Sequence, residues 1–303
     1  MPYSSLGRRD FIRSSLTAAA GTSALAASSS VAMEPIPRVA GHHFKLSLAA
    51  YSYRELLQAD PPQMSMLDFL DECERLGLDG AELTSYYFPA ELNGEYLRRL
   101  KGDAFRRGLD VSGTAIRNDF CLPPGERRDG EIAHVKRWIE YADMMDAPVI
   151  RIFAGAAQPG QSFAEASKLA AAAIEECCRH AAKYGVFLAL ENHGGITANV
   201  DEMLTIVRAV ESPWFGVNMD TGNFYSADVY GDLAKLAPYA INVQVKVLIK
   251  PEGQDVQPAD LGRLARMLRT ANYRGYVVLE LETDGDAREE CEKYVNELRA
   301  AIA

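Results

Sequence analysis

From residue 44 onward, short runs of apolar and β-branched residues alternate with longer amphipathic stretches. Eight such runs are present, each of a length that suits one buried strand, and each is followed by enough chain for one helix. The runs are Leu46–Ala50, Gly80–Leu83, Leu109–Gly113, Pro148–Phe153, Val186–Glu191, Phe215–Met219, Ile241–Val247 and Tyr276–Leu281. This order predicts repeated strand–helix units and a parallel sheet.

The helical stretches carry their own start and stop signals. Ser65 and Asp68, three residues apart, match a capping box, and Gly77 marks the end of the same helix. Asn199 is predicted to cap a later helix. Pro258 is expected in the first turn of another helix, where its missing N–H costs nothing.

Eight strand–helix units fit a closed (β/α)₈ TIM barrel, which typically needs about 250 residues. The alternative is an open doubly wound sheet, which usually carries a glycine-rich phosphate loop after its first strand. Here the first run continues into Tyr51-Ser52-Tyr53-Arg54 without a GxGxxG pattern. We therefore predict a single α/β domain, a TIM barrel over residues 44–303.

The first 32 residues differ from the rest and match an export signal. The paired arginines Arg8 and Arg9 precede an apolar pair, and an Ala-rich stretch with small-residue cleavage sites follows. This order is typical of the twin-arginine pathway, and the apolar stretch is shorter than the about 20 residues of a membrane span. We predict residues 1–32 to be a signal peptide and spacer, and the protein to be periplasmic or otherwise exported.

Composition and charge narrow the range of partners. The chain has 303 residues, 48% of them hydrophobic, and a formal net charge of −10. An acidic surface repels nucleic-acid phosphates and anionic lipids, so we expect neither nucleic acid nor, beyond the export signal, a membrane as partner. The five cysteines form no CxxC pattern and are interpreted as packing residues. A small-molecule substrate is expected, and the sequence leaves a homo-oligomer open.

Polar side chains gather where the predicted strands end, which is the end of a TIM barrel that carries function. The predicted strands five, six and eight each lead to a carboxylate, namely Glu191, Asp220 and Glu280. Carboxylates crowded into a barrel mouth repel one another, and a bound cation is the simplest remedy. Oxygen ligands favour Mg²⁺ or Mn²⁺, while a nearby His or Gln also admits Zn²⁺ or Co²⁺. The sequence therefore predicts one divalent metal.

The same residues carry a family resemblance. The segments Leu188–His193 and Asp220–Asn223, and Tyr273–Tyr276 leading to Glu280, resemble the sugar phosphate isomerase/epimerase superfamily of xylose isomerase-like barrels. The resemblance implies that Glu191, Asp220 and Glu280 are metal ligands. On the seventh strand the family usually has His-x-Lys-Asp, whereas this chain has Gln244-Val245-Lys246-Val247. Gln244 thus takes the place of the fourth ligand, and its oxygen favours Mg²⁺ or Mn²⁺ over softer metals.

This resemblance implies proton transfer next to a carbonyl group. In an isomerase or epimerase acting on a sugar or keto-sugar, the metal would stabilise an enediolate while Glu191 and Glu280 move the proton. Lys246 is expected to donate to substrate oxygens, and His193 to orient Glu191 or contact a hydroxyl. Further expected substrate contacts are Arg151, Glu82, Asn218, Asn223 and Tyr51, with Tyr86 and Phe120 completing an aromatic wall.

Three alternatives stay open. A lyase or dehydratase acting on an oxidised (keto) sugar or glycoside would share the enolate step but lose a β-substituent. A non-catalytic sugar-binding barrel with a degraded metal site would account for Gln244. A relative of the barrel endonucleases that cleave DNA at abasic sites would need several His ligands, and this acidic chain has five His in all. Export also argues against a phosphorylated substrate.

Overall fold

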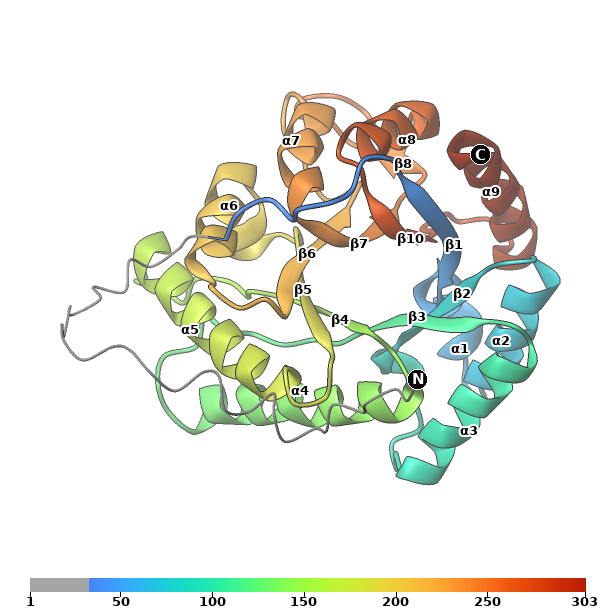
Figure 1. The fold of residues 1–303 in the computed structure, drawn as a ribbon, viewed down its shortest axis with the longest axis horizontal. Coiled ribbons are helices and arrows are strands. Elements are labelled where there is room, and N and C mark those ends of the chain that lie inside the picture. Colours follow the sequence, from blue (N-terminus) through green and yellow to red (C-terminus); the bar gives the residue numbers. More distant parts are fainter. Residues whose placement is uncertain (1–32) are drawn as a thin grey trace, which may run out of the picture. The chain divides into compact units, whose positions relative to one another are not determined.

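The computed structural model describes residues 33–303, and its strands close into a barrel (Figure 1). Within this range, eight parallel strands pair in the closed order β1-β10-β7-β6-β5-β4-β3-β2. They are β1 (His43–Ala49), β2 (Gly80–Thr84), β3 (Asp110–Ala115), β4 (Val149–Ile152), β5 (Phe187–Glu191), β6 (Phe215–Asp220), β7 (Ala240–Val245) and β10 (Arg274–Leu279). The predicted TIM barrel is thereby confirmed. A short hairpin of β8 (Leu248–Ile249) and β9 (Gln257–Pro258) lies between β7 and β10 in the sequence.

Helices surround the strands, as Figure 1 shows. They are α1 (Arg54–Leu57), α2 (Met66–Arg75), α3 (Gly94–Arg106), α4 (Glu126–Met145), α5 (Phe163–Ala181), α6 (Val200–Ala209), α7 (Val229–Leu236), α8 (Leu261–Thr270) and α9 (Ala287–Ile302). Side chains alternate along each strand between this helical layer and the barrel interior. Along β5, for example, Leu188 and Leu190 belong to the hydrophobic core, whereas Glu191 ends the strand at the barrel mouth.

Two of the predicted helix caps are present, and one predicted helix start is wrong. Ser65 and Asp68 form the capping box that opens α2, and the Asn199 side chain caps α6. Pro258 lies in β9 instead of a first helical turn, and Asp260 caps α8 two residues later. Pro258 is exposed and belongs to a two-residue strand, where a missing N–H is tolerated.

A segment ahead of β1 crosses the end of the barrel at which the strands begin. The backbone N–H of Ile36 donates to the carbonyl of Pro238, just before β7, over 3.0 Å. The guanidinium of Arg38 donates to the carbonyls of Pro238 and Ala240. The chain ahead of β1 is thereby bound to the residues at the start of β7.

The predicted export signal, with Arg8 and Arg9, lies in residues 1–32 and thus outside the described residues, so export stays a prediction. Between residues 33 and 303, no helix is long and apolar enough to cross a membrane. All five cysteines lie in the described part of the chain, where they are buried and free. This confirms their interpretation as packing residues.

Candidate functional site

A cavity of about 1110 Å³ opens at the carboxyl ends of the strands. Its wall combines acids and cations from several strand ends with aromatic side chains, namely Arg151, Glu191, Lys246 and Glu280 with Tyr51, Tyr86, Trp138 and Phe153. Small-molecule sites have this mixture of apolar walls and a few convergent polar groups. The position also matches the end of TIM barrels that carries function, so we assign the candidate active site to this cavity.

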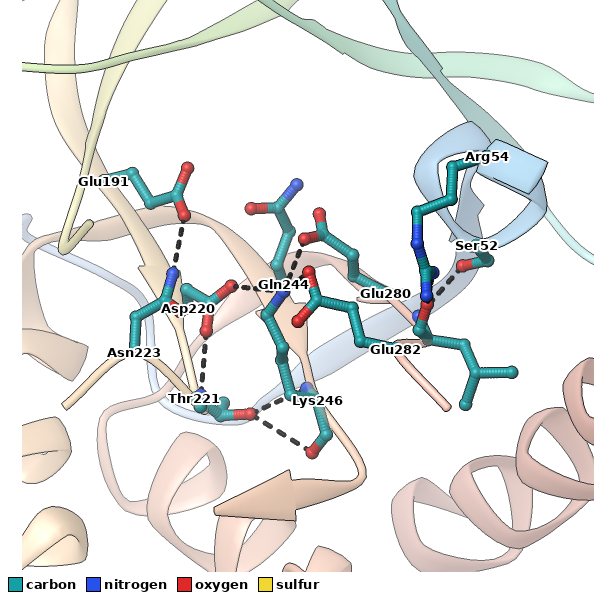
Figure 2. A network of polar contacts seen from close by, with 12 residues as sticks. Ser52, Arg54, Glu191, Asp220, Thr221, Asn223, Gln244, Lys246, Glu280 and Glu282 are labelled. Atoms are coloured by element: carbon teal, nitrogen blue, oxygen red, sulfur yellow. Dashed lines mark hydrogen bonds and ion pairs between the residues drawn. The ribbon is translucent and has the colours of Figure 1, made fainter. Parts of the chain in front are cut away.

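Lys246 lies among three carboxylates on one side of the cavity (Figure 2). Its Nζ is 2.7 Å from Oε1 of Glu280, 2.8 Å from Oε1 of Glu282 and 3.6 Å from Oδ2 of Asp220. Lys246 and Glu280 each follow directly after neighbouring strands, β7 and β10, so strand pairing brings them together. Burial lowers the pKa of Lys246, but the three carboxylates outweigh burial and hold that pKa well above its ordinary value. The lysine is therefore a permanent cation.

The two glutamates after β10 are oriented by the segment that follows β1. The backbone N–H of Leu281 donates to Oγ of Ser52 over 2.9 Å. Nη1 of Arg54 donates to the carbonyl of Leu281 over 3.0 Å. Because Leu281 separates Glu280 from Glu282, these two bonds fix the backbone from which both acids reach Lys246 (Figure 2).

A second ion pair joins β4 and β5. Nε of Arg151 lies 2.8 Å from Oε2 of Glu191, and both side chains are buried. Oε1 of Glu191 accepts a hydrogen bond from Nδ2 of Asn223 over 2.9 Å. The guanidinium also lies 4.2 Å from the centroid of the Phe153 ring and 3.3 Å from Oη of Tyr86.

The pKa of Glu191 suits a proton-transfer group. Burial raises the pKa of Glu191 well above its ordinary value, and the attraction of Arg151 offsets only part of this rise. A carboxyl group acts best as a general acid or base when its pKa approaches the working pH. Glu191 thus combines a position on the cavity wall with a pKa that burial raises well above its ordinary value.

Beneath the cavity, four polar side chains form a network inside the barrel. Nε2 of Gln244 donates to Oε1 of Glu82 over 2.6 Å, and Nδ2 of Asn242 donates to Oε2 of Glu82 over 2.9 Å. Asn218 closes the network, since its Nδ2 donates to Oε1 of Gln244 over 2.6 Å and its Oδ1 accepts from Asn242 over 2.8 Å. Burial raises the pKa of Glu82 to about 7, Glu280 adds to the rise, and the two amides offset part of it.

The structure brings some expected residues to the cavity and places others beneath it. The cavity is lined by Tyr51, Arg151, Glu191, His193, Asn223, Lys246 and Glu280. Glu82, Asn218, Asp220 and Gln244 are buried and are not among the residues that line it. The expectation that Phe120 belongs to the aromatic wall is wrong. Its ring is fully buried in the hydrophobic core, where it escapes water, and Phe153 and Trp138 contribute to the wall instead.

Some residues of the site were missed by the sequence reasoning. Asn242 precedes Gln244 and Lys246 on one strand at a period of two, so the alternation rule would have placed it on the same face. Trp138 comes from the middle of α4, far from any strand end, and no sequence signal marks it. Phe153 directly follows β4, and the rule that strand ends carry function includes it.

A divalent cation at this site would need oxygens from several side chains that face one point. Within residues 33–303, no three His, Cys, Asp or Glu side chains are grouped so as to hold a metal ion. Glu191 and Glu280 contact cationic side chains, and both amide atoms of Gln244 are bonded beneath the cavity. Among the expected ligands in the described structure, Oε2 of Glu191 and Oδ2 of Asp220 accept no hydrogen bond, but each faces a cation, Nε of Arg151 at 2.8 Å and Nζ of Lys246 at 3.6 Å. As these side chains are arranged, the expected ligand set does not fit a divalent metal.

Residues 70–301 match the sequence pattern of a protein family, the xylose isomerase-like TIM barrels. The chain belongs to this family. The comparison with curated proteins gave no match. The family assignment agrees with the closed eight-stranded barrel of the described residues and with a candidate site at its carboxyl end.

Solved structures of xylose isomerase-like barrels resemble the chain over most of its length. D-psicose 3-epimerase from Clostridium cellulolyticum H10 has a TM-score of 0.71 at 14% identity, covering 85% of this chain and 99% of that one. A 3-keto-D-glucoside 4-epimerase from E. coli has a TM-score of 0.64 at 17% identity, covering 85% and 99%. A probable 3-DHS dehydratase from Bacillus anthracis has a TM-score of 0.65 at 17% identity, covering 84% and 98%. At these identities the similarity shows the shared fold alone.

Proposed function

We propose that this xylose isomerase-like barrel is an isomerase or epimerase that transfers a proton next to the carbonyl group of a sugar or keto-sugar. The observation that carries the proposal is a pair of carboxylates, Glu191 and Glu280, each in contact with a cation and both lining one cavity. Such a reaction needs a base to remove the proton, an acid to return it, and positive charge near the developing enediolate oxygen. The cavity wall supplies all three.

The two acids approach the cavity from separate parts of the barrel. Glu191 ends β5 and Glu280 follows β10, and β6 and β7 lie between these strands. A substrate bound between the two acids would present opposite faces of its reacting carbon to them. One acid would remove the proton from one face and the other would return a proton to the opposite face, which inverts the carbon.

Cations and aromatic rings complete the proposed substrate site. Arg151 and Lys246 would donate hydrogen bonds to the carbonyl and hydroxyl oxygens as negative charge develops there. His193 lines the cavity with its ring 4.4 Å from that of Phe153, and would contact a hydroxyl group. Aromatic faces such as that of Tyr51 would pack against the C–H face of a sugar ring.

The charges of the cavity favour a substrate without a phosphate group. Its lining contains five acids and three Arg or Lys side chains, namely Asp119, Glu131, Glu191, Glu280 and Glu282 with Arg117, Arg151 and Lys246. Two of the three cations are already in contact with carboxylates. A phosphate dianion would therefore meet net repulsion, which supports a free sugar, keto-sugar or glycoside and agrees with the predicted export.

Hydrogen exchange tests the proposal directly. The protein would be incubated in D₂O with D-fructose, D-psicose, D-tagatose and a 3-keto-D-glucoside, and the protons next to the carbonyl followed by NMR. We expect deuterium to enter that position in at least one of them, and the E191Q and E280Q variants to lose exchange by about 100-fold or more. Lys235→Ala, on the exposed face of α7, is the matched control and should exchange like the wild type.

Each other outcome of this experiment identifies an alternative. Exchange accompanied by release of water or an aglycone would identify a lyase or dehydratase, because elimination starts from the same enolate. Sugar binding without exchange, in all four probes, would contradict the proposal and favour a non-catalytic sugar-binding barrel.

A further inference from the structure

The ammonium group of Lys246 is held in place by the chain around it. A Cβ built on Gly222 would lie 2.8 Å from Cβ and 2.9 Å from Cγ of Lys246, so only glycine leaves room for the lysine stem. The backbone N–H of Lys246 donates to Oγ1 of Thr221 over 2.9 Å. Nζ lies 5.7 Å from the centroid of the Tyr51 ring, and 9% of the side chain is exposed. Stem, backbone and charged end are thus all fixed by neighbouring residues.

Two of the three acids around this lysine, Asp220 and Glu280, are acids that the family resemblance assigns to a metal. Glu280 contacts Nζ at 2.7 Å, and Oδ2 of Asp220 lies 3.6 Å from it. Oδ1 of Asp220 accepts a hydrogen bond from the backbone N–H of Gly222 over 2.8 Å. The positive charge that these acids require is therefore supplied by a side chain of the protein.

Gln244 reinforces this arrangement from the neighbouring position on β7. It stands where the family usually has a histidine, yet its Oε1 accepts from Asn218 and its Nε2 donates to Glu82. Both polar ends of this amide are thus used inside the barrel, away from the cavity. The fourth position of the expected ligand set has become part of the barrel's internal hydrogen-bond network.

We propose that Lys246 is the resident cation of this acid cluster and that the site needs no divalent metal. The family usually has a lysine at this position as well, together with a histidine ligand. Here that ligand is replaced by Gln244, which is bonded to Asn218 and Glu82, so the ammonium group 2.7 Å from Glu280 and 3.6 Å from Asp220 takes the place of a divalent cation at these oxygens. The chemical role of Lys246 rests on the proposed function.

In the proposed proton transfer, a glutamate takes the proton from carbon and the C–H electron pair moves into the new C=C bond. The carbonyl oxygen then gains negative charge facing the Lys246 ammonium. Return of a proton to carbon restores the carbonyl.

Metal content and metal response test the inference without any substrate. The wild type would be purified without chelator from Mn²⁺-supplemented medium, its metal measured by mass spectrometry, and its Tm compared with and without MnCl₂. We expect metal far below one ion per chain and no change in Tm. Stoichiometric metal, or a wild-type Tm raised by Mn²⁺, would overturn the inference.

Removing the lysine should create the metal site that it now excludes. In Lys246→Gln, the acids Asp220, Glu280 and Glu282 lose their cation, so Mn²⁺ should bind to them. We expect added Mn²⁺ to raise the Tm of this variant, and the EPR signal of Mn²⁺ to broaden when the variant is present. Lys235→Ala is the matched control, because it removes an exposed lysine that also lies between two acids, Asp201 and Asp232, each at 3.4 Å. It should gain no Mn²⁺ response. A K246Q variant that folds and ignores Mn²⁺ would contradict the inference, and if it fails to fold, the wild-type measurements decide.

Deuterium exchange after EDTA treatment separates this inference from the proposed function. Unchanged exchange by the metal-free wild type supports both. Exchange that EDTA abolishes and Mn²⁺ restores overturns the metal-free inference and leaves the isomerase proposal standing. A metal-free protein that shows no exchange with or without Mn²⁺ overturns the isomerase proposal, while Lys246 is still the resident cation.

Discussion

Arg151 and Glu191 form a buried ion pair in which Nε and Oε2 lie 2.8 Å apart. Strand pairing sets this contact, because Arg151 lies opposite Ala189 in the register of β4 and β5, and Glu191 follows two residues later on the same face. The Phe153 ring lies against the guanidinium at 4.2 Å and limits its movement. The orientation of one proposed catalytic carboxylate therefore depends on one arginine.

Replacing Arg151 with Met should destabilise the protein by on the order of 3 to 5 kcal/mol, because Glu191 would stay buried without its cation. Met retains much of the apolar stem, so lost packing adds little. The change would be measured as the free energy of unfolding in urea. The double variant R151M/E191Q is the control, and should recover at least about 1 kcal/mol of the combined loss. If the losses in free energy of unfolding of R151M and E191Q simply add up in the double variant, the two side chains do not stabilise each other.

Gly222→Ala should destabilise the protein by about 1 to 3 kcal/mol through overpacking, because the new Cβ would lie 2.8 Å from Cβ of Lys246. Neither atom is the free end of a side chain, so the backbone of the segments that follow β6 and β7 must shift. Thermal unfolding would measure the effect. Gly130→Ala is the matched control, since it lies in α4 with no atom of the described structure within 4 Å of an added Cβ. That change should be neutral or slightly stabilising, and equal losses in both variants would contradict the crowding argument.

Most strands of the barrel could be predicted from the local hydrophobic pattern. The pairing that closes the barrel and the short β8–β9 hairpin could not. The eight apolar runs locate the strands because each buried strand must be apolar on its outer face. The first strand nevertheless starts earlier than predicted, at His43, because His43 and Phe44 pair with Arg274 and Gly275 where β10 closes the barrel. Closure is a contact between chain ends, and no local hydrophobic pattern encodes it. The β8–β9 hairpin, with two residues in each strand, is too short to produce a pattern.

In the site, the sequence could place residues but not their partners. Glu191, Asp220 and Glu280 follow from the rule that strand ends form the barrel mouth. That Lys246 reaches Glu280 depends on a side-chain conformation set by contact with Gly222, which no spacing rule describes. The bond between Gln244 and Glu82 crosses the barrel interior from β7 to β2, and these strands are not neighbours in the sheet.

Glu82 should make stability fall with rising pH. Burial raises the pKa of this carboxyl from 4.5 to about 7, so the folded chain binds the proton more tightly than the unfolded chain. Its stabilising contribution is complete below pH 4.5, declines as pH rises toward 7, and is lost above that. Glu82→Gln should remove this decline, so the free energy of unfolding of the variant relative to the wild type should rise by on the order of 3 kcal/mol between pH 5 and pH 8, measured by urea unfolding. Glu297→Gln, on the exposed face of α9, should leave the wild-type slope unchanged.

The pH dependence of catalysis should report the Arg151–Glu191 pair. If Glu191 removes the proton, kcat/KM rises with pH as its carboxyl ionises, and the rising limb should lie well above the ordinary glutamate pKa because burial raises the pKa of Glu191. Arg151 lowers that pKa, so in Arg151→Met the limb should move to higher pH. Arg151→Lys keeps a cation and should move it less. A limb at the ordinary glutamate pKa, or one that R151M leaves in place, would assign proton removal to another group, with Glu280 the next to test.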